Sequence, residues 1–278
     1  MWDCVMENQF IRSYPMPKSG VYQGDRRRER VIVSLTSFPE RIETAYYAIK
    51  SLMIQSFQAD EILLWLAEEQ FPERRLPESY DDLISRGLQI RWCRDLKSHK
   101  KYYYVLQEQR EDQIVITYDD DIIYEYDSIE RLIAAHGVYP DCIVCNRGHT
   151  MKVSEGKLTA YSQWKLRTEE GNMMPSRKIM PSTGAGCLYP YHCMPSVTFD
   201  EKCIRENAFL ADDIWMRFCS LQNDVQVVKT REKWATLCNV FCSQKIRLTQ
   251  KNDIEGNNQV VIDQLLKIFP DTVTHLMK

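Results

Sequence analysis

The chain has 278 residues, of which 44% are hydrophobic and 27% are charged, and its formal net charge at pH 7 is −3. This length suits one large domain, and the acidic balance excludes a nucleic-acid-binding protein that relies on its overall charge. The longest apolar run, residues 62–67, is far shorter than the roughly 20 residues that span a bilayer. Because the N-terminus also lacks the regions of a signal peptide, we expect a cytoplasmic protein.

Residues 1–30 are expected to form an irregular N-terminal extension. This extension ends in the basic run GDRRRER, residues 24–30. The run has two interpretations, which are a solvated leader or a contact with an anionic lipid or a phosphorylated acceptor.

After residue 30, predicted strands and helices alternate. The strands are residues 31–35, 61–67, 88–93 and 113–119. The helices between them begin at Pro39, span 76–87 with Gly87 closing the helix, and span 100–110. The strands are apolar throughout rather than alternating, which is typical of a parallel sheet covered on both faces. This order predicts an α/β fold with an open, doubly wound sheet.

The second half of the chain has a weaker pattern. We expect a helix at 128–139, a strand at 142–146, a helix within 209–222, a strand at 225–229 and an amphipathic helix near 258–269. Residues 147–187 lack a pattern, and a long patternless loop in a compact domain is typically functional.

The ten cysteines are scattered along the chain, and several lie in apolar segments. Cys142 and Cys145 have the spacing of half a zinc site, but no second pair stands at the matching distance. We therefore expect reduced thiols that are mostly buried.

Three consecutive aspartates, Asp119, Asp120 and Asp121, follow the fourth predicted strand. In parallel sheets ligands bind at the carboxyl ends of the strands. Residues one apart project to the same side, so Asp119 and Asp121 are expected to converge on one hard cation, such as Mg²⁺ or Mn²⁺ with a diphosphate. In the alternative interpretation, one aspartate caps a turn and the others are solvated.

Four segments, taken in order, resemble the metal-dependent GT-A glycosyltransferases, most closely bacterial enzymes that build surface polysaccharides. They are VIVSLTSFPERI, KKYYYVLQEQREDQIVITYDDDIIY, GAGCLYP and LADDIW, and together they span roughly residues 31–220. The resemblance implies a GT-A fold, with an open, mostly parallel twisted sheet flanked by helices and a smaller mixed region on the acceptor side. It also implies a single domain over 31–278, with a nucleotide-binding half (31–125) and an acceptor-binding half (126–278).

The resemblance assigns a role to each aspartate of the triplet. Asp121 would bind the metal and bridge to the donor diphosphate. Asp119 would face the ribose or share the metal, and Asp120 would lie near the sugar.

The same resemblance places further donor-binding residues before the triplet. Ser34, Thr36 and Arg41 stand where the first strand and its loop hold the nucleotide, although Arg41 could equally be a surface residue. Lys101 stands where a lysine would pair with the diphosphate. Lys100 and His99 compete for that role, and a solvated helix start is the simpler interpretation.

LADDIW supplies the second acidic feature. An inverting transferase needs a carboxylate that deprotonates the acceptor hydroxyl. In the related pattern this base is Asp213, and Asp212 supports it or contacts the acceptor. The alternative is helix capping, because aspartate at a helix N-terminus satisfies free N–H groups.

The sequence therefore predicts a glycosyltransferase that uses Mn²⁺ or Mg²⁺ and a nucleotide-sugar donor, most simply a UDP-sugar. Its acceptor would be an oligosaccharide or lipid-linked glycan of lipopolysaccharide or capsule, which suits a peripheral position at the inner face of the cytoplasmic membrane. Two alternatives remain open. One is a metal-dependent phosphohydrolase with Asp119 as nucleophile, and the other is a non-catalytic protein that binds nucleotide sugars.

Overall fold

A computed structural model describes residues 2–168, 172–230, 238–241, 243 and 256–278. The chain divides into two compact units. The first contains the described residues within 1–96, 100–131 and 233–246, and the second contains those within 97–99, 132–232 and 247–278. That the two units are halves of one domain stays a prediction.

The first unit is built on four parallel strands in the order β3-β2-β1-β4. Its elements are α1 (Trp2–Ser13), β1 (Arg30–Thr36), α2 (Ile42–Met53), β2 (Glu61–Ala67), α3 (Ser79–Ser85), β3 (Leu88–Cys93), α4 (Lys100–Gln107), β4 (Gln113–Tyr118), β5 (Ile122–Ile123) and β13 (Cys238–Asn239). The helix α5 (Ser128–Val138) begins in this unit and continues into the second. Each strand and helix expected between residues 31 and 119 is confirmed.

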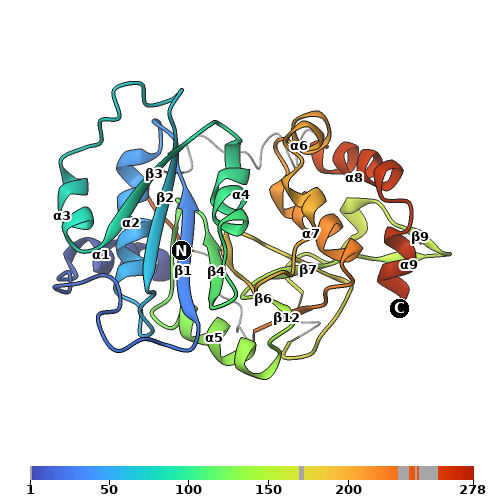
Figure 1. Ribbon diagram of the computed structural model, residues 1–278, viewed down its shortest axis with the longest axis horizontal. Coiled ribbons are helices and arrows are strands. Elements are labelled where there is room, and N and C mark those ends of the chain that lie inside the picture. The colour runs from blue at the N-terminus through green and yellow to red at the C-terminus, as the bar shows by residue number, and fades with distance from the viewer. Residues whose placement is uncertain (1, 169–171, 231–237, 242, 244–255) are drawn as a thin grey trace. The chain divides into compact units, whose positions relative to one another are not determined.

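The chain order of these strands determines where a ligand can bind. Right-handed crossovers place α2 and α3 on one face of the sheet and α4 on the other (Figure 1). The strand order reverses between β1 and β4, which makes this pair the topological switch point. The carboxyl ends of β1 and β4 lead into Ser37 and into the aspartate triplet.

The prediction that residues 1–30 are irregular is wrong for residues 2–13, which form α1. Asn8 in this helix is buried, and its side-chain amide donates to the Asn239 carbonyl at 3.0 Å and accepts the Phe241 N–H at 2.9 Å. β13 in turn pairs with β5, and the Val240 N–H donates to the Asp121 carbonyl at 2.8 Å. The helix thus depends on partners more than 200 positions away, which local periodicity cannot reveal.

The second unit contains a mixed sheet, in which β6 pairs antiparallel with β11 and parallel with β12. Two smaller antiparallel pairs, β7 with β10 and β8 with β9, accompany it. Its elements are β6 (Ile143–Cys145), β7 (Gly148–Thr150), β8 (Val153–Ser154), β9 (Lys157–Leu158), β10 (Ile179–Pro181), β11 (Ala185–Tyr189), α6 (Glu201–Asn207), α7 (Asp212–Gln222), β12 (Val227–Lys229), α8 (Asn257–Ile268) and α9 (Thr272–Met277), with 3₁₀ turns at Lys97–His99, Tyr161–Gln163 and Ser196–Phe199.

Residues 147–187 are therefore not one patternless loop. They include β7 to β10 and the start of β11, and these strands are too short to show an alternating pattern. Together the two units confirm the predicted fold class, which is α/β with a mostly parallel sheet flanked by helices and a smaller mixed region.

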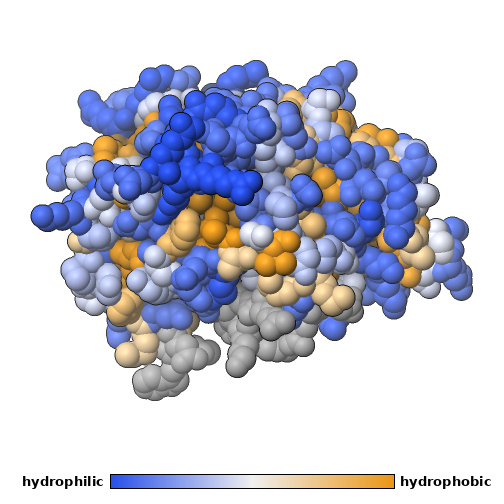
Figure 2. Space-filling model, turned by 60° about the horizontal axis from the view of Figure 1, so that its bottom comes forward, coloured by the Kyte–Doolittle hydropathy of each residue, from blue (hydrophilic) through white to orange (hydrophobic). Residues whose placement is uncertain are grey.

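The surface is predominantly hydrophilic on the face drawn in Figure 2. Large apolar side chains that are exposed include Met6 and Phe10 on α1. No helix in the described part of the chain is both long enough and apolar enough to cross a bilayer.

A buried histidine makes the second unit sensitive to acid. His149 on β7 is 8% exposed, and its Nδ1 accepts the Arg167 N–H at 2.9 Å. Burial, together with the charges of Arg147 and Arg167, lowers the pKa of His149 to about 4. His149 is therefore neutral in the folded state over a range where an unfolded histidine is protonated.

This pKa predicts a specific loss of stability at low pH. Above pH 6.5 neither state binds the proton. As the pH falls from 6.5 towards 4, only the unfolded state does, so folding weakens by roughly 1.4 kcal/mol per pH unit. His149→Asn keeps an acceptor but cannot titrate, so urea unfolding between pH 7 and 4 should show a shallower loss for this variant. The exposed His192→Asn is the control, and parallel curves for all three proteins would contradict the prediction.

Candidate active site

The aspartate triplet lies in a short connection between β4, which ends at Tyr118, and β5. Tyr124 fixes this connection, because its hydroxyl donates to the Asp119 carbonyl at 2.9 Å and accepts the Asp119 N–H at 2.8 Å. Tyr124 is buried and packs edge-on against Tyr118, with 4.4 Å between ring centroids. Tyr124 was not among the predicted site residues, although it is an aromatic residue only three positions after Asp121.

Asp120 is the buried member of the triplet, with 4% of its surface exposed. The Ser37 hydroxyl donates to its Oδ2 at 2.5 Å, and Arg41 Nη1 donates to its Oδ1 at 2.9 Å. Burial raises the pKa of Asp120, while Arg41 and Ser37 oppose that shift. Burial also acts to lower the pKa of Arg41, but Asp120 and Asp121 outweigh it, so the guanidinium stays charged. The alternative that Arg41 is a surface residue is therefore wrong.

Arg41 contacts a second aspartate of the triplet. Its Nη1 lies 3.1 Å from Asp121 Oδ2, so one guanidinium bridges Asp120 and Asp121. The convergence of Asp119 and Asp121 on one divalent cation stays a prediction. The alternation behind that prediction applies only within a strand, and β4 ends before Asp119.

Asp119 pairs with Lys101 at the start of α4. The distance from Lys101 Nζ to Asp119 Oδ1 is 2.7 Å, and the lysine side chain is 3% exposed whereas the aspartate is 41% exposed. The two competitors for this role have other partners: Lys100 pairs with Asp95 at 3.0 Å, and His99 hydrogen-bonds the Ala208 carbonyl. The structure thus brings Lys101, rather than Lys100 or His99, to the triplet, and its pairing with a diphosphate stays a prediction.

Ser34 and Thr36 at the end of β1 have structural partners. The Ser34 hydroxyl donates to the Lys101 carbonyl at 2.6 Å and accepts Trp65 Nε1–H at 3.0 Å, and Ser34 is fully buried. The Thr36 hydroxyl donates to the Trp65 carbonyl at 2.7 Å. Ser34 therefore fixes the start of α4 and with it Lys101. Nucleotide contacts by Ser34 and Thr36 stay predictions.

The triplet fits a divalent cation only if a substrate completes the coordination. In the described ranges, no group of three or more His, Cys, Asp or Glu side chains is arranged to hold a metal by itself. Mg²⁺ and Mn²⁺, however, commonly take one or two carboxylates together with phosphate oxygens and water. Asp119 is the most accessible candidate ligand, and Asp121 is 15% exposed.

The second acidic pair lies in the second unit, in the first turn of α7. The N-cap residue of this helix is Ala211, which makes no side-chain capping bond. The Thr183 N–H donates to Asp213 Oδ1 at 2.9 Å, and the Thr183 hydroxyl contacts Asp212 Oδ2 at 2.8 Å and also Asp213 Oδ1. Asp213 is thus not the N-cap of α7, although a carboxylate there still gains from the helix dipole.

Thr183 is the residue of this site that the sequence analysis missed. It lies between β10 and β11, next to the GAGCLYP segment, and no spacing rule points to it. Within that segment Gly186 has φ +97°, a backbone conformation that favours glycine.

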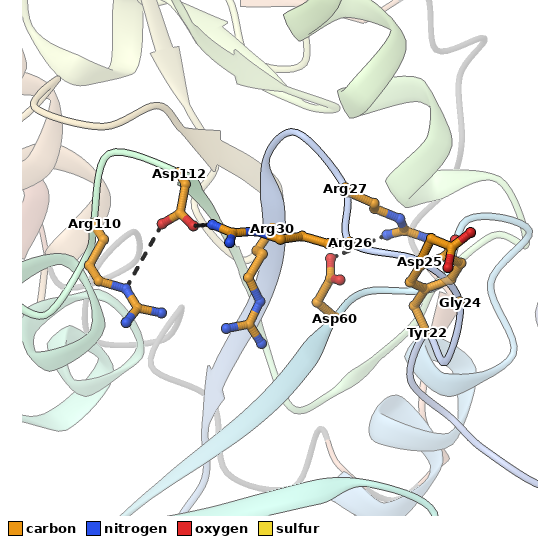
Figure 3. A pocket seen from close by; sticks show the side chains of 9 residues that line it. All are labelled: Tyr22, Gly24, Asp25, Arg26, Arg27, Arg30, Asp60, Arg110 and Asp112. Carbon is orange, nitrogen blue, oxygen red and sulfur yellow. Dashed lines mark hydrogen bonds and ion pairs between the residues drawn. The ribbon is translucent and has the colours of Figure 1, made fainter.

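An arginine-rich cleft of about 630 Å³ lies at the amino ends of the strands in the first unit, away from the triplet (Figure 3). It is lined by Tyr22, Gly24, Asp25, Arg26, Arg27, Arg30, Asp60, Arg110 and Asp112. Arginines of the basic run pair with acids here, including Arg26 with Asp112 at 2.8 Å and Arg27 with Asp60 at 3.3 Å. The contact with an anionic lipid stays a prediction.

No family model matches the chain, and no curated protein matches it in sequence. Solved structures with some likeness include the mannosyltransferase PcManGT from Pyrobaculum calidifontis in complex with GDP-Man and Mn²⁺, with 11% identity and a TM-score of 0.43. TarS 1–349 from S. aureus in complex with UDP has 14% identity and a TM-score of 0.44. The matches cover 81% and 72% of this chain, but only 60% and 58% of those chains.

The ion pair between Arg41 and Asp120 predicts a large effect on stability. Arg41→Met leaves a buried carboxylate without its cation and should lower the free energy of unfolding by about 3–5 kcal/mol. Adding Asp120→Asn removes that charge and should recover most of the loss. Urea unfolding measures both variants, with the exposed Arg26→Met as the control. An Arg41→Met variant as stable as this control would contradict the assignment.

Proposed function

We propose that the protein is a metal-dependent glycosyltransferase that moves a sugar from a nucleotide-diphosphate donor, most simply a UDP-sugar, to a hydroxyl of a glycan. One observation carries the proposal. At the carboxyl ends of β1 and β4, where the strand order reverses, three aspartates stand beside Arg41 and Lys101. The carboxylates suit a divalent cation, and the two basic side chains suit a diphosphate.

On the donor side, Asp121 and Asp119 would hold Mn²⁺ or Mg²⁺ together with the diphosphate oxygens. The metal would supply positive charge that offsets the charge on the leaving diphosphate. Asp120 is held by Ser37 and Arg41 and would lie near the sugar. Arg41 and Lys101 would exchange part of their pairing with the triplet for the diphosphate.

On the acceptor side, Asp213 would act as the general base. The acceptor oxygen would bond to the anomeric carbon as the bond from that carbon to the diphosphate breaks, and the hydroxyl proton would pass to Asp213. Attack from the face opposite the leaving group would invert the anomeric configuration. Asp212 would support Asp213 or contact the acceptor.

The proposed acceptor is an oligosaccharide or lipid-linked glycan in the synthesis of bacterial lipopolysaccharide or capsule. This part of the proposal is supported by the resemblance of the four sequence segments. We also propose a cytoplasmic enzyme in peripheral contact with the membrane. Arg26 in the arginine-rich cleft has a side chain that is 79% exposed and would suit anionic lipid.

One experiment separates the three candidate functions. The protein is incubated with Mn²⁺, a panel of nucleotide sugars and simple phosphate monoesters, and the products are identified by NMR. Slow release of UDP from one nucleotide sugar supports the transferase, and the anomeric configuration of a glycan product gives the stereochemistry. Phosphate release from the monoesters would favour the phosphohydrolase. Saturable donor binding without turnover would favour the non-catalytic protein.

Substitutions in the aspartate triplet and in the Asp212–Asp213 pair should impair different steps, donor binding in the first case and transfer in the second. Asp121→Asn should abolish the metal-dependent part of donor binding. Asp213→Asn should leave the donor Kd within about twofold but lower kcat by about 10²–10⁴-fold, the usual contribution of a general base. Donor affinity from calorimetry and kcat from UDP release give the two readouts. A loss of donor affinity in Asp213→Asn would overturn the assignment of roles.

A further inference from the structure

We infer that Thr183 is a positioning residue that orients Asp213 for proton transfer. Two donors of this one residue, its backbone N–H and its hydroxyl, contact the same carboxylate oxygen, Asp213 Oδ1. These two contacts anchor one oxygen of the carboxylate. The inference rests on the proposed function, in which Asp213 is the base.

The backbone holds Thr183 itself firmly in place. The residue is fully buried. On one side the Ser182 N–H donates to the Arg147 carbonyl at 2.9 Å, and on the other the Ala185 N–H donates to the Ser182 carbonyl at 3.1 Å. Thr183 thus sits in a turn that is tied to the residues after β6 and leads directly into β11. A donor fixed in this way can fix its acceptor.

The charge of Asp213 also acts on two buried side chains of β11. Burial raises the pKa of both Cys187 and Tyr189 well above their ordinary values, and the charge of Asp213 adds to each shift. In such surroundings a hydrogen bond to a carboxylate is stronger than in water. Removal of the Thr183 hydroxyl should therefore weaken the orientation of the Asp213 carboxylate.

Asp212 competes for the Thr183 hydroxyl. This hydroxyl has one proton and two carboxylate neighbours, with Asp212 Oδ2 at 2.8 Å. The backbone N–H of Thr183 donates to Asp213, so Asp213 keeps one donor whichever carboxylate receives the hydroxyl proton. The arrangement thus favours Asp213 as the oriented carboxylate and gives Asp212 a secondary role.

The test compares Thr183→Val, which keeps the size and the N–H but loses the hydroxyl, with Thr183→Ser, which keeps the hydroxyl. Thr183→Val should lower kcat by about 10–100-fold, the effect expected when a reacting group is misplaced. Its donor KM should stay within about twofold, and Thr183→Ser should keep kcat within about threefold of wild type. Thr183→Ala replaces Thr183→Val if the latter does not fold.

A double-mutant cycle shows whether Thr183 acts through Asp213. Thr183→Val should lower kcat no further in Asp213→Asn, but should keep its full effect in Asp212→Asn. An equal fractional loss in the Asp213→Asn background would overturn the inference, and so would a Thr183→Val enzyme with wild-type kcat while Asp213→Asn is inactive. Wild-type turnover by Asp213→Asn would instead overturn the proposed function.

Discussion

The compensation of three adjacent carboxylates at the end of β4 is the constraint on which the rest of the first unit depends. Asp120 is almost completely buried, so its charge requires a nearby cation. That cation is the guanidinium of Arg41, the residue immediately before α2. Asp119 receives Lys101 from the start of α4, whose position is fixed in turn by the Ser34 hydroxyl. Elements that precede β4 in the chain thus meet at its carboxyl end because the strand order reverses there. The same basic side chains that stabilise the triplet would also suit a diphosphate, so stability and the proposed donor binding would share one set of side chains.

In the second unit, the carboxylate of Asp213 is likewise held by residues from another part of the fold. Asp213 lies at the start of α7, where the helix dipole favours a negative charge, and Thr183 fixes it from a turn between two strands. Arg217, one turn further along α7, is fully buried and donates to the Val225 and Arg177 carbonyls. Because α7 is anchored in this way, the orientation of Asp213 is set by packed backbone rather than by a mobile loop.

The sequence predicted the α/β class and the strands and helices of the first unit between residues 31 and 119. These were predictable because buried parallel strands have continuous apolar sequences, and the helices between them have recognisable boundaries. The resemblance assigned Lys101 and Arg41 to the donor, which stays a prediction, and the structure shows that both contact the triplet. Three features could not be predicted from the sequence because they do not depend on local sequence patterns. The helix α1 depends on Asn8 contacting a strand far along the chain, the strands within 147–187 are too short for a period to appear, and Thr183 matters only because folding brings it to Asp213. The convergence of Asp119 and Asp121 on one cation stays a prediction, and strand alternation does not support it because β4 ends at Tyr118.

In the proposed function, the triplet would exchange part of its pairing with Arg41 and Lys101 for a divalent cation held by a nucleotide diphosphate. Calorimetric titration of the unaltered protein with UDP, in matched buffers containing either Mn²⁺ or EDTA, tests this claim most directly. We expect saturable UDP binding in Mn²⁺ and at least a tenfold weaker affinity in EDTA, a difference of about 1.4 kcal/mol or more in binding free energy. Equal affinity in the two buffers, or no UDP binding in either, would contradict it.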